Sequence, residues 1–226
     1  MEIRTANQDA LFKQWPEHWP SKDHYVSQHD VTRDQFLGFK NLIENRASET
    51  EIERFLADNQ EILALLIFLF SSGHHASWIY PKQNIRPSSG EAGGMIPDYV
   101  MAGANSDGVS WYILELKGAN HNGFVSRGKR VYLSNEANKG ICQLMNYIDA
   151  SARSQGYLRD ELRLNGYREP NGILLIGNGD EAENDQIQAF KGAWNRMNPR
   201  VQIVSYARLL RVVETKLDSK KANQGP

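Results

Sequence analysis

Three charged residues near the middle of the chain have the types and the spacing to do chemistry together. Asp98 follows a proline in MIPDYVMA (residues 95–102). Glu115 and Lys117 lie inside the apolar run SWYILELKG (residues 110–118). Side chains alternate along a strand, so Glu115 and Lys117 face the same way. Because charged side chains are seldom buried unless they are paired or bind a metal, this placement calls for a partner.

A cation shared by the two acids would meet that need. The two segments are predicted to be strands joined by the turn sequence NSDG (residues 105–108), so Asp98 and Glu115 can converge at one edge of a sheet. Two carboxylates repel each other unless a cation lies between them, and Mg²⁺ prefers oxygen ligands. Lys117 could then orient or activate a water, or stabilise charge that develops on a phosphorus centre.

The ordinary interpretation of E-x-K on a strand is an exposed salt-bridging pair. Here the flanking residues are apolar, and Asp98 lies 17 residues upstream of Glu115 across a plausible hairpin turn. These two features favour a site over a surface pair.

The elements that must position these residues are predicted from periodicity and caps. Ser48 and Glu51 have capping-box spacing at the start of an apolar helical pattern. We predict helices at residues 30–46, 48–66, 134–153, 185–195 and 207–217, and strands at 79–87, 95–102, 110–118, 172–179 and 201–206. This order predicts an α/β fold with a mixed central sheet flanked by helices. The predicted parts are a helical, variable N-terminal segment (1–47), one domain (48–215) and a flexible tail (216–226).

Composition sets the class of protein. With 226 residues and 40% hydrophobic residues the chain can form a sizeable core. Its one cysteine, Cys142, excludes an intramolecular disulfide and fits a reducing compartment. We expect no signal peptide, and the most apolar run, Ile62–Phe70, is too short to span a bilayer. A cytoplasmic protein without membrane contact is therefore predicted.

The distribution of charge allows a nucleic-acid partner. The net charge is −1, but residues 117–168 hold nine lysines and arginines against four acids. A solvated basic face is the alternative explanation. Four of these cations follow the E-x-K strand and are candidates for contacts to backbone phosphates: Arg127, Lys129, Arg130 and Lys139.

The set Pro97-Asp98 and Glu115-Leu116-Lys117 resembles the PD-(D/E)xK motif of restriction-endonuclease-like nucleases. Glu49 lies on a helix ahead of the hairpin, where many of these nucleases carry a further acid near the metal. Gln143 and Tyr147 are similar to the QxxxY motif of one branch, and their i, i+4 spacing puts both on one helix face. A core tyrosine beside an exposed glutamine is the alternative for that pair.

The ordered segments from about Ser48 to Val213 resemble the Shedu anti-phage nuclease domain more narrowly. The resemblance implies that Asp98, Glu115, the Leu116 carbonyl and Glu49 bind Mg²⁺, with Mn²⁺ as a possible substitute. It implies that Lys117 is catalytic, that Gln143 and Tyr147 support it, and that the chain forms a dimer or tetramer. Such proteins usually carry a proline after the helix asparagine, whereas Gln60 follows Asn59 here. Glu51 and Glu53 therefore remain alternatives to Glu49.

Three hypotheses follow. The first is a Mg²⁺-dependent DNA endonuclease that acts in bacterial anti-phage defence. The second is a nuclease-fold protein that binds nucleic acid or a partner without cleaving it. The third is an ordinary α/β protein with a chance E-x-K, which predicts that Asp98 and Glu115 lie far apart.

Overall fold

A computed structural model of the chain describes residues 15–70, 74–85, 95–180 and 184–223. The beginning of the predicted N-terminal segment, the end of the predicted strand 79–87 and the last residues of the predicted tail lie outside these ranges.

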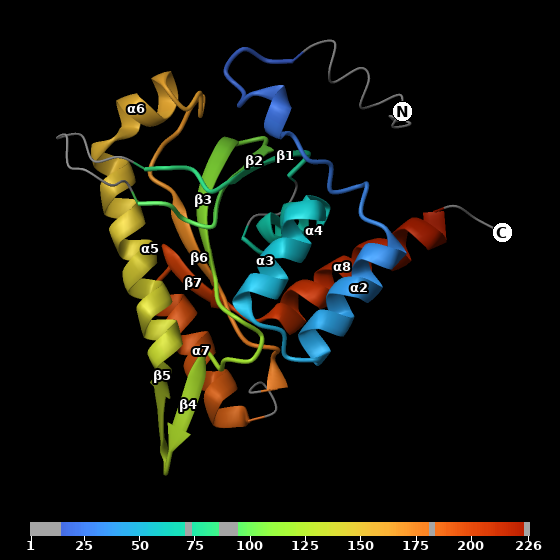
Figure 1. Cartoon of the computed structure of the whole chain (residues 1–226), viewed down its shortest axis with the longest axis vertical. Helices are drawn as coiled ribbons and strands as arrows, with labels where there is room; N and C mark the ends of the chain where they lie inside the picture. The colour runs from blue at the N-terminus through green and yellow to red at the C-terminus, as the bar shows by residue number, and fades with distance from the viewer. Residues whose placement is uncertain (1–14, 71–73, 86–94, 181–183, 224–226) are drawn as a thin grey trace.

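The five strands of the central sheet have the order β1-β2-β3-β6-β7. Their bounds are Ala76–Pro81 (β1), Tyr99–Asn105 (β2), Gly108–Leu116 (β3), Asn171–Leu175 (β6) and Val201–Val204 (β7). The first three strands pair antiparallel, and β3, β6 and β7 pair parallel. The predicted α/β fold with a mixed sheet flanked by helices is thus confirmed (Figure 1).

Helices cover both faces of the sheet because both faces carry apolar side chains. Tyr112, Leu114 and Leu116 of β3 join one core cluster, and Trp111 and Ile113 join the other. The first cluster includes residues of α2 (Arg33–Glu44), α3 (Glu49–Asp58), α4 (Gln60–Leu66), η2 (Ile67–Leu69) and α8 (Tyr206–Asn223). The second includes residues of α5 (Asn135–Arg153), α6 (Gln155–Asp160) and α7 (Asp185–Met197). A short helix, η1 (Lys22–His24), precedes α2.

The hairpin between β2 and β3 turns where NSDG predicted it, with Asn105 paired to Gly108. The edge strand β1 begins earlier than predicted and ends at Pro81. One isolated bridge, Ile85 to Met95, follows it.

The predicted helix 48–66 is divided in two, and the single-helix prediction is wrong. Asn59 has φ −136° and ψ 54°, outside the helical region, and separates α3 from α4. Its side chain donates a hydrogen bond to the carbonyl of Phe55, at 2.7 Å. Asparagine side chains compete in this way with the helical backbone, which favours a break over continuation.

Two strands were not predicted. β4 (Phe124–Arg127) and β5 (Arg130–Leu133) form a separate hairpin with Gly128 in its turn at φ 61°. Figure 1 shows this hairpin extending away from the central sheet. Each strand has only four residues, and polar residues lie among its apolar ones, so the sequence shows no clear period-two pattern.

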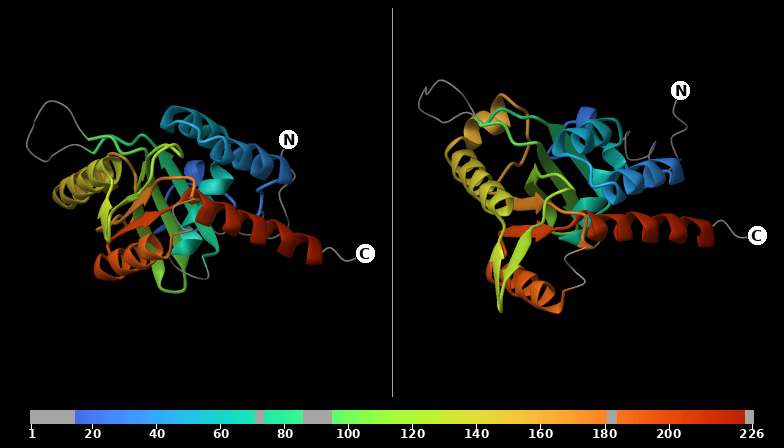
Figure 2. Two further views of the ribbon diagram at one scale, coloured as in Figure 1. Left: turned by 90° about the horizontal axis from the view of Figure 1, so that it is seen from below. Right: turned by 60° about the horizontal axis from the view of Figure 1, so that its bottom comes forward.

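The prediction of a flexible tail from residue 216 is wrong as far as Asn223, because α8 continues to that residue. Leu217 is buried, and Lys220 Nζ donates to the carbonyl of Val31, at 2.8 Å. Figure 2 shows α8 running beside α2, and the two helices are in contact. Across the described ranges, no helix is long and apolar enough to cross a membrane.

Candidate active site

A row of charged residues lies across the ends of three neighbouring strands. The β2–β3 register pairs Tyr99 with Leu114, so one step further Asp98 lies opposite Glu115. The β1–β2 register pairs Pro81 with Tyr99, and Lys82 N–H continues it by donating to the Asp98 carbonyl at 3.0 Å. Directly opposite residues share a face, with Cβ atoms about 5 Å apart. The two acids therefore converge, contrary to the chance-pattern hypothesis.

Asp98 is buried and uses both carboxylate oxygens. Oδ2 accepts the N–H of Leu116 at 2.7 Å, and Oδ1 accepts Lys82 Nζ at 2.6 Å. Lys117 N–H donates to Leu175 on the β6 side, so the N–H and C=O of Leu116 point towards β2. The residue opposite Leu116 there is Pro97, which has no N–H to give to its carbonyl.

Glu115 and Lys117 form a buried ion pair. Their Oε1 and Nζ atoms are 2.8 Å apart, and the residues are 3% and 6% exposed. Burial, followed by the charge of Asp98, raises the pKa of Glu115 to about 7, although Lys117 lowers it. Burial opposes the charge on Lys117, but Glu115, Glu49 and Asp98 outweigh it and raise the Lys117 pKa. The surrounding acids thus favour the protonated form of Lys117.

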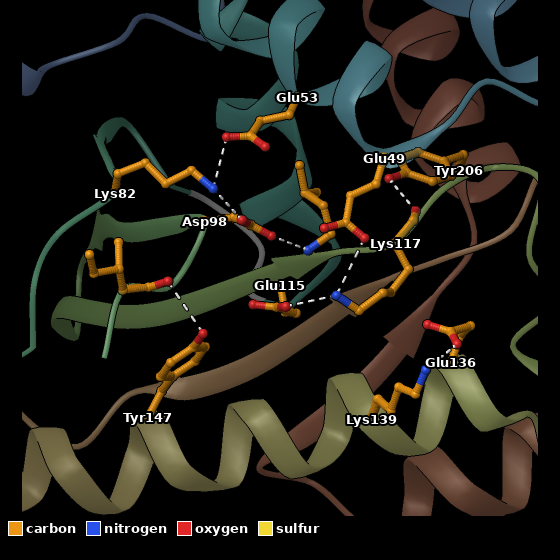
Figure 3. A network of polar contacts seen from close by, with 12 residues as sticks. Glu49, Glu53, Lys82, Asp98, Glu115, Lys117, Glu136, Lys139, Tyr147 and Tyr206 are labelled. Atoms are coloured by element: carbon orange, nitrogen blue, oxygen red, sulfur yellow. Dashed lines mark hydrogen bonds and ion pairs between the residues drawn. The ribbon is translucent and has the colours of Figure 1, made fainter. Parts of the chain in front are cut away.

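The first turns of α3 separate the three candidate glutamates. Glu51 is committed to the predicted capping box, where its carboxylate accepts the N–H of Ser48 at 2.8 Å. Glu49 lies 3.4 Å from Lys117 Nζ, and Glu53, one turn later, lies 2.8 Å from Lys82 Nζ. Glu49 and Glu53 thus face the site (Figure 3), whereas the Glu51 carboxylate bonds to Ser48.

Lysines and carboxylates alternate through the site. Lys117 joins Glu49 to Glu115, and Lys82 joins Glu53 to Asp98 (Figure 3). In the part of the chain that the structure describes, no three side chains of His, Cys, Asp or Glu are grouped so that they could hold a metal as they stand. Two carboxylates and the Leu116 carbonyl nevertheless form an all-oxygen set, which suits a hard cation such as Mg²⁺. The donor chemistry fits Mg²⁺ once the two lysines release the carboxylates.

Comparison with known proteins gives the family. The family model described as "Shedu protein SduA, C-terminal" matches residues 46–210, which include every strand of the central sheet and all the residues of the row. The chain belongs to this Shedu family. Membership implies a role in anti-phage defence. No curated protein matches the chain.

In this Shedu chain, two residues that sequence reasoning did not single out hold the segment after β3 in place. Tyr206, at the start of α8, donates its buried hydroxyl to the carbonyl of Lys117 at 2.8 Å. Gly118 lies against α3, and a Cβ there would be 3.1 Å from the Glu49 nitrogen and 2.1 Å from Asn120 Oδ1. The glycine directly after E-L-K was the one available signal; nothing in the sequence pairs Tyr206 with Lys117.

Gln143 and Tyr147 lie on the face of α5 that is directed to the sheet. Tyr147 is 9% exposed and donates its hydroxyl to the carbonyl of Ile96, at 3.3 Å. Burial and then the charges of Glu115 and Asp98 raise the Tyr147 pKa, while a hydrogen bond with Gln143 opposes the rise. The phenol therefore lies within the electrostatic reach of both acids. Figure 3 shows Tyr147 extending from α5 towards the sheet.

The four candidate phosphate contacts fall in two places. Arg127 and Arg130 are cross-strand partners at the end of the β4–β5 hairpin, with Lys129 in its turn, and all three are exposed. Lys139 lies on α5 and pairs with Glu136 at 2.7 Å. The structure thus gathers three of the cations at one projecting tip and leaves the fourth apart.

Replacing Tyr206 with phenylalanine tests the support of Lys117. We expect Y206F to lower the free energy of unfolding by about 1–3 kcal/mol, because the buried Lys117 carbonyl loses its donor. Urea denaturation measures this. Y132F, which alters an exposed tyrosine, should change stability by less than about 0.5 kcal/mol, and equal effects of the two variants would contradict the assignment.

The raised pKa of Glu115 predicts a pH dependence of stability in metal-free buffer. Between about pH 4.5 and 7 the folded state keeps a proton that the unfolded state releases, so stability falls as pH rises through this window. We expect the wild type to lose on the order of 1–3 kcal/mol more than E115Q between pH 5 and pH 8. Urea denaturation with EDTA at both pH values checks this; parallel pH profiles would refute it.

Proposed function

We propose that this Shedu chain is a Mg²⁺-dependent DNA endonuclease that hydrolyses phosphodiester bonds in anti-phage defence. One observation carries the proposal: Asp98 lies opposite Glu115 on a buried row, with the Lys117 ammonium 2.8 Å from Glu115. Burying two adjacent acids and a lysine costs stability and adds nothing to the packing of the core. Such clusters of buried ionisable groups with shifted pKa values are typical of reactive sites.

The cation would be held by Asp98, Glu115 and the Leu116 carbonyl, with Glu49 as a further acid on α3. When bound there, Mg²⁺, or Mn²⁺ in its place, supplies positive charge that polarises a phosphoryl group. The binding of the ion requires the ion pairs of the acids with Lys82 and Lys117 to rearrange.

Lys117 supplies the charge stabilisation that phosphodiester hydrolysis needs. Its ammonium is protonated at neutral pH and lies in a site from which water is largely excluded, where a hydrogen bond to a phosphate oxygen is worth more than in bulk water. Tyr206 holds the Lys117 backbone, so the ammonium is positioned before substrate arrives. Tyr147 and Gln143 add two polar groups on the α5 side of the same row.

The β4–β5 hairpin is the proposed contact with DNA. Like charges directly opposite each other on paired strands are unfavourable, yet Arg127 faces Arg130 at its tip. Neither these arginines nor Lys129 takes part in any of the salt bridges found among the described residues. Backbone phosphates would relieve this repulsion without selecting a base sequence.

Cleavage of linear and supercoiled DNA by the purified protein tests the proposed activity. We expect cutting with Mg²⁺, none with EDTA, and a loss of about 100-fold or more in both E115A and K117A. The matched control is E136Q, which alters an acid of the exposed Glu136–Lys139 pair on α5 and should retain activity.

Each variant is also tested for DNA binding by fluorescence anisotropy. Wild-type protein that binds DNA but does not cut it with Mg²⁺ or Mn²⁺ would favour the binding-only hypothesis. The intact set of Asp98, Glu115 and Lys117 argues for cleavage, because a protein that only binds has no need of it.

A second prediction concerns the hairpin. Replacing Arg127, Lys129 and Arg130 together with glutamine should weaken DNA binding and make its dependence on log salt concentration shallower by roughly 2–3. The control removes three cations that already have acidic partners, Arg33, Lys40 and Arg200. Equal losses in the two triple variants would show that only net charge matters and would contradict a specific role of the hairpin.

A further inference from the structure

Lys82 is a second lysine of the site, and neither the E-x-K pattern nor the family resemblance assigns it a role. Its Nζ lies 2.6 Å from Asp98 Oδ1 and 2.8 Å from Glu53 Oε1 (Figure 3). Its side chain is 47% exposed, against 8% for Lys117. Lys82 can therefore change position at the surface, whereas Lys117 is enclosed by the core.

The backbone of Lys82 is tied to the same aspartate. Lys82 has φ 49°, in the left-handed region that non-glycine residues seldom adopt and that costs on the order of 1 kcal/mol or more. Its N–H donates to the Asp98 carbonyl at 3.0 Å, and the Ile85–Met95 bridge follows a few residues later. Pairing on both sides thus holds Lys82 beside Asp98 in a conformation that a freely placed surface lysine would not need.

The ammonium of Lys82 contacts the oxygen of Asp98 that a divalent cation would bind. Asp98 Oδ2 is taken by Leu116 N–H, and Oδ1 is taken by Lys82. A divalent cation on Asp98 would compete with the ammonium for the same oxygen, and the two positive charges repel each other. Glu53 already contacts the ammonium and offers it a place to remain.

We infer that Lys82 competes with the divalent cation for Asp98. When the cation binds, Glu53 retains the ammonium of Lys82. The inference rests on the proposed function, because it takes the cation site of that proposal as its starting point. Competition by Lys82 lowers the affinity of the DNA-free site for the divalent cation. Binding of the cation then depends more strongly on the oxygen ligands that a bound phosphate brings.

Titration of metal-free protein with Mn²⁺ by isothermal calorimetry tests this without any measurement of cleavage. K82M removes the competitor, and we expect it to bind Mn²⁺ about tenfold more tightly than the wild type. K82R keeps the charge and should stay close to the wild type. E53Q leaves the ammonium with Asp98 alone and should bind Mn²⁺ several-fold more weakly.

The opposite signs of K82M and E53Q distinguish competition from a structural role, which would weaken binding in both. K139M removes an exposed lysine that is paired only with Glu136 and serves as the control for net charge. Equal tightening in K82M and K139M, or no tightening in K82M, would overturn the inference while leaving the metal site in place. Failure of both wild type and K82M to bind Mn²⁺ would overturn the proposed metal site and the inference with it.

Discussion

The antiparallel pairing of β2 with β3 is the constraint on which the site depends. Its seven residue pairs bring Asp98 opposite Glu115 and send Leu114 and Leu116 into the core on the other face. A slip of one residue would turn every side chain of one strand to the opposite face. Glu115 would then enter an apolar cluster, so the same packing that stabilises the sheet also enforces the meeting of the two acids.

Placing two carboxylates side by side costs electrostatic energy. Two lysines offset this repulsion, rather than exposure of the acids to water. Lys117 is buried and anchored through its backbone by Tyr206, whereas Lys82 is half-exposed and bridges two acids at the edge of the sheet. A buried cation fixed to the scaffold suits charge stabilisation, and a more mobile one suits exchange with a metal. The two lysines therefore have different environments and, in our proposals, different tasks.

Helix α3 joins the two pairs. Its capping box uses Glu51. Residues four apart lie on the same face of a helix, so Glu49 and Glu53 point the same way, Glu49 towards Lys117 and Glu53 towards Lys82. The break at Asn59 ends this helix, and α4 continues beneath the sheet with buried apolar side chains. The absence of a side chain at Gly118 lets the start of α3 approach β3 closely.

Several features followed from local sequence alone. Alternation of apolar residues predicted β3 and both of its faces, NSDG predicted the turn, and Ser48 with Glu51 predicted the helix start, because each depends on residues close together in the chain. The pairing of Asp98 with Glu115 could also be anticipated, since a short hairpin leaves few registers. The assignments of these residues to metal binding and catalysis came from family resemblance and remain proposals.

Other features were decided only by the tertiary structure. Lys82 with Glu53, and Tyr206 with Lys117, are far apart in the chain, and no local pattern predicts which distant group a lysine or a tyrosine will meet. The final turns of α8 looked too polar for order but are helical beside α2, through Leu217 and the contact of Lys220 with Val31. Sequence determined which groups could react and on which face of each element they lie. Packing decided which charges neutralise each other, because that depends on distance and burial and not on order along the chain.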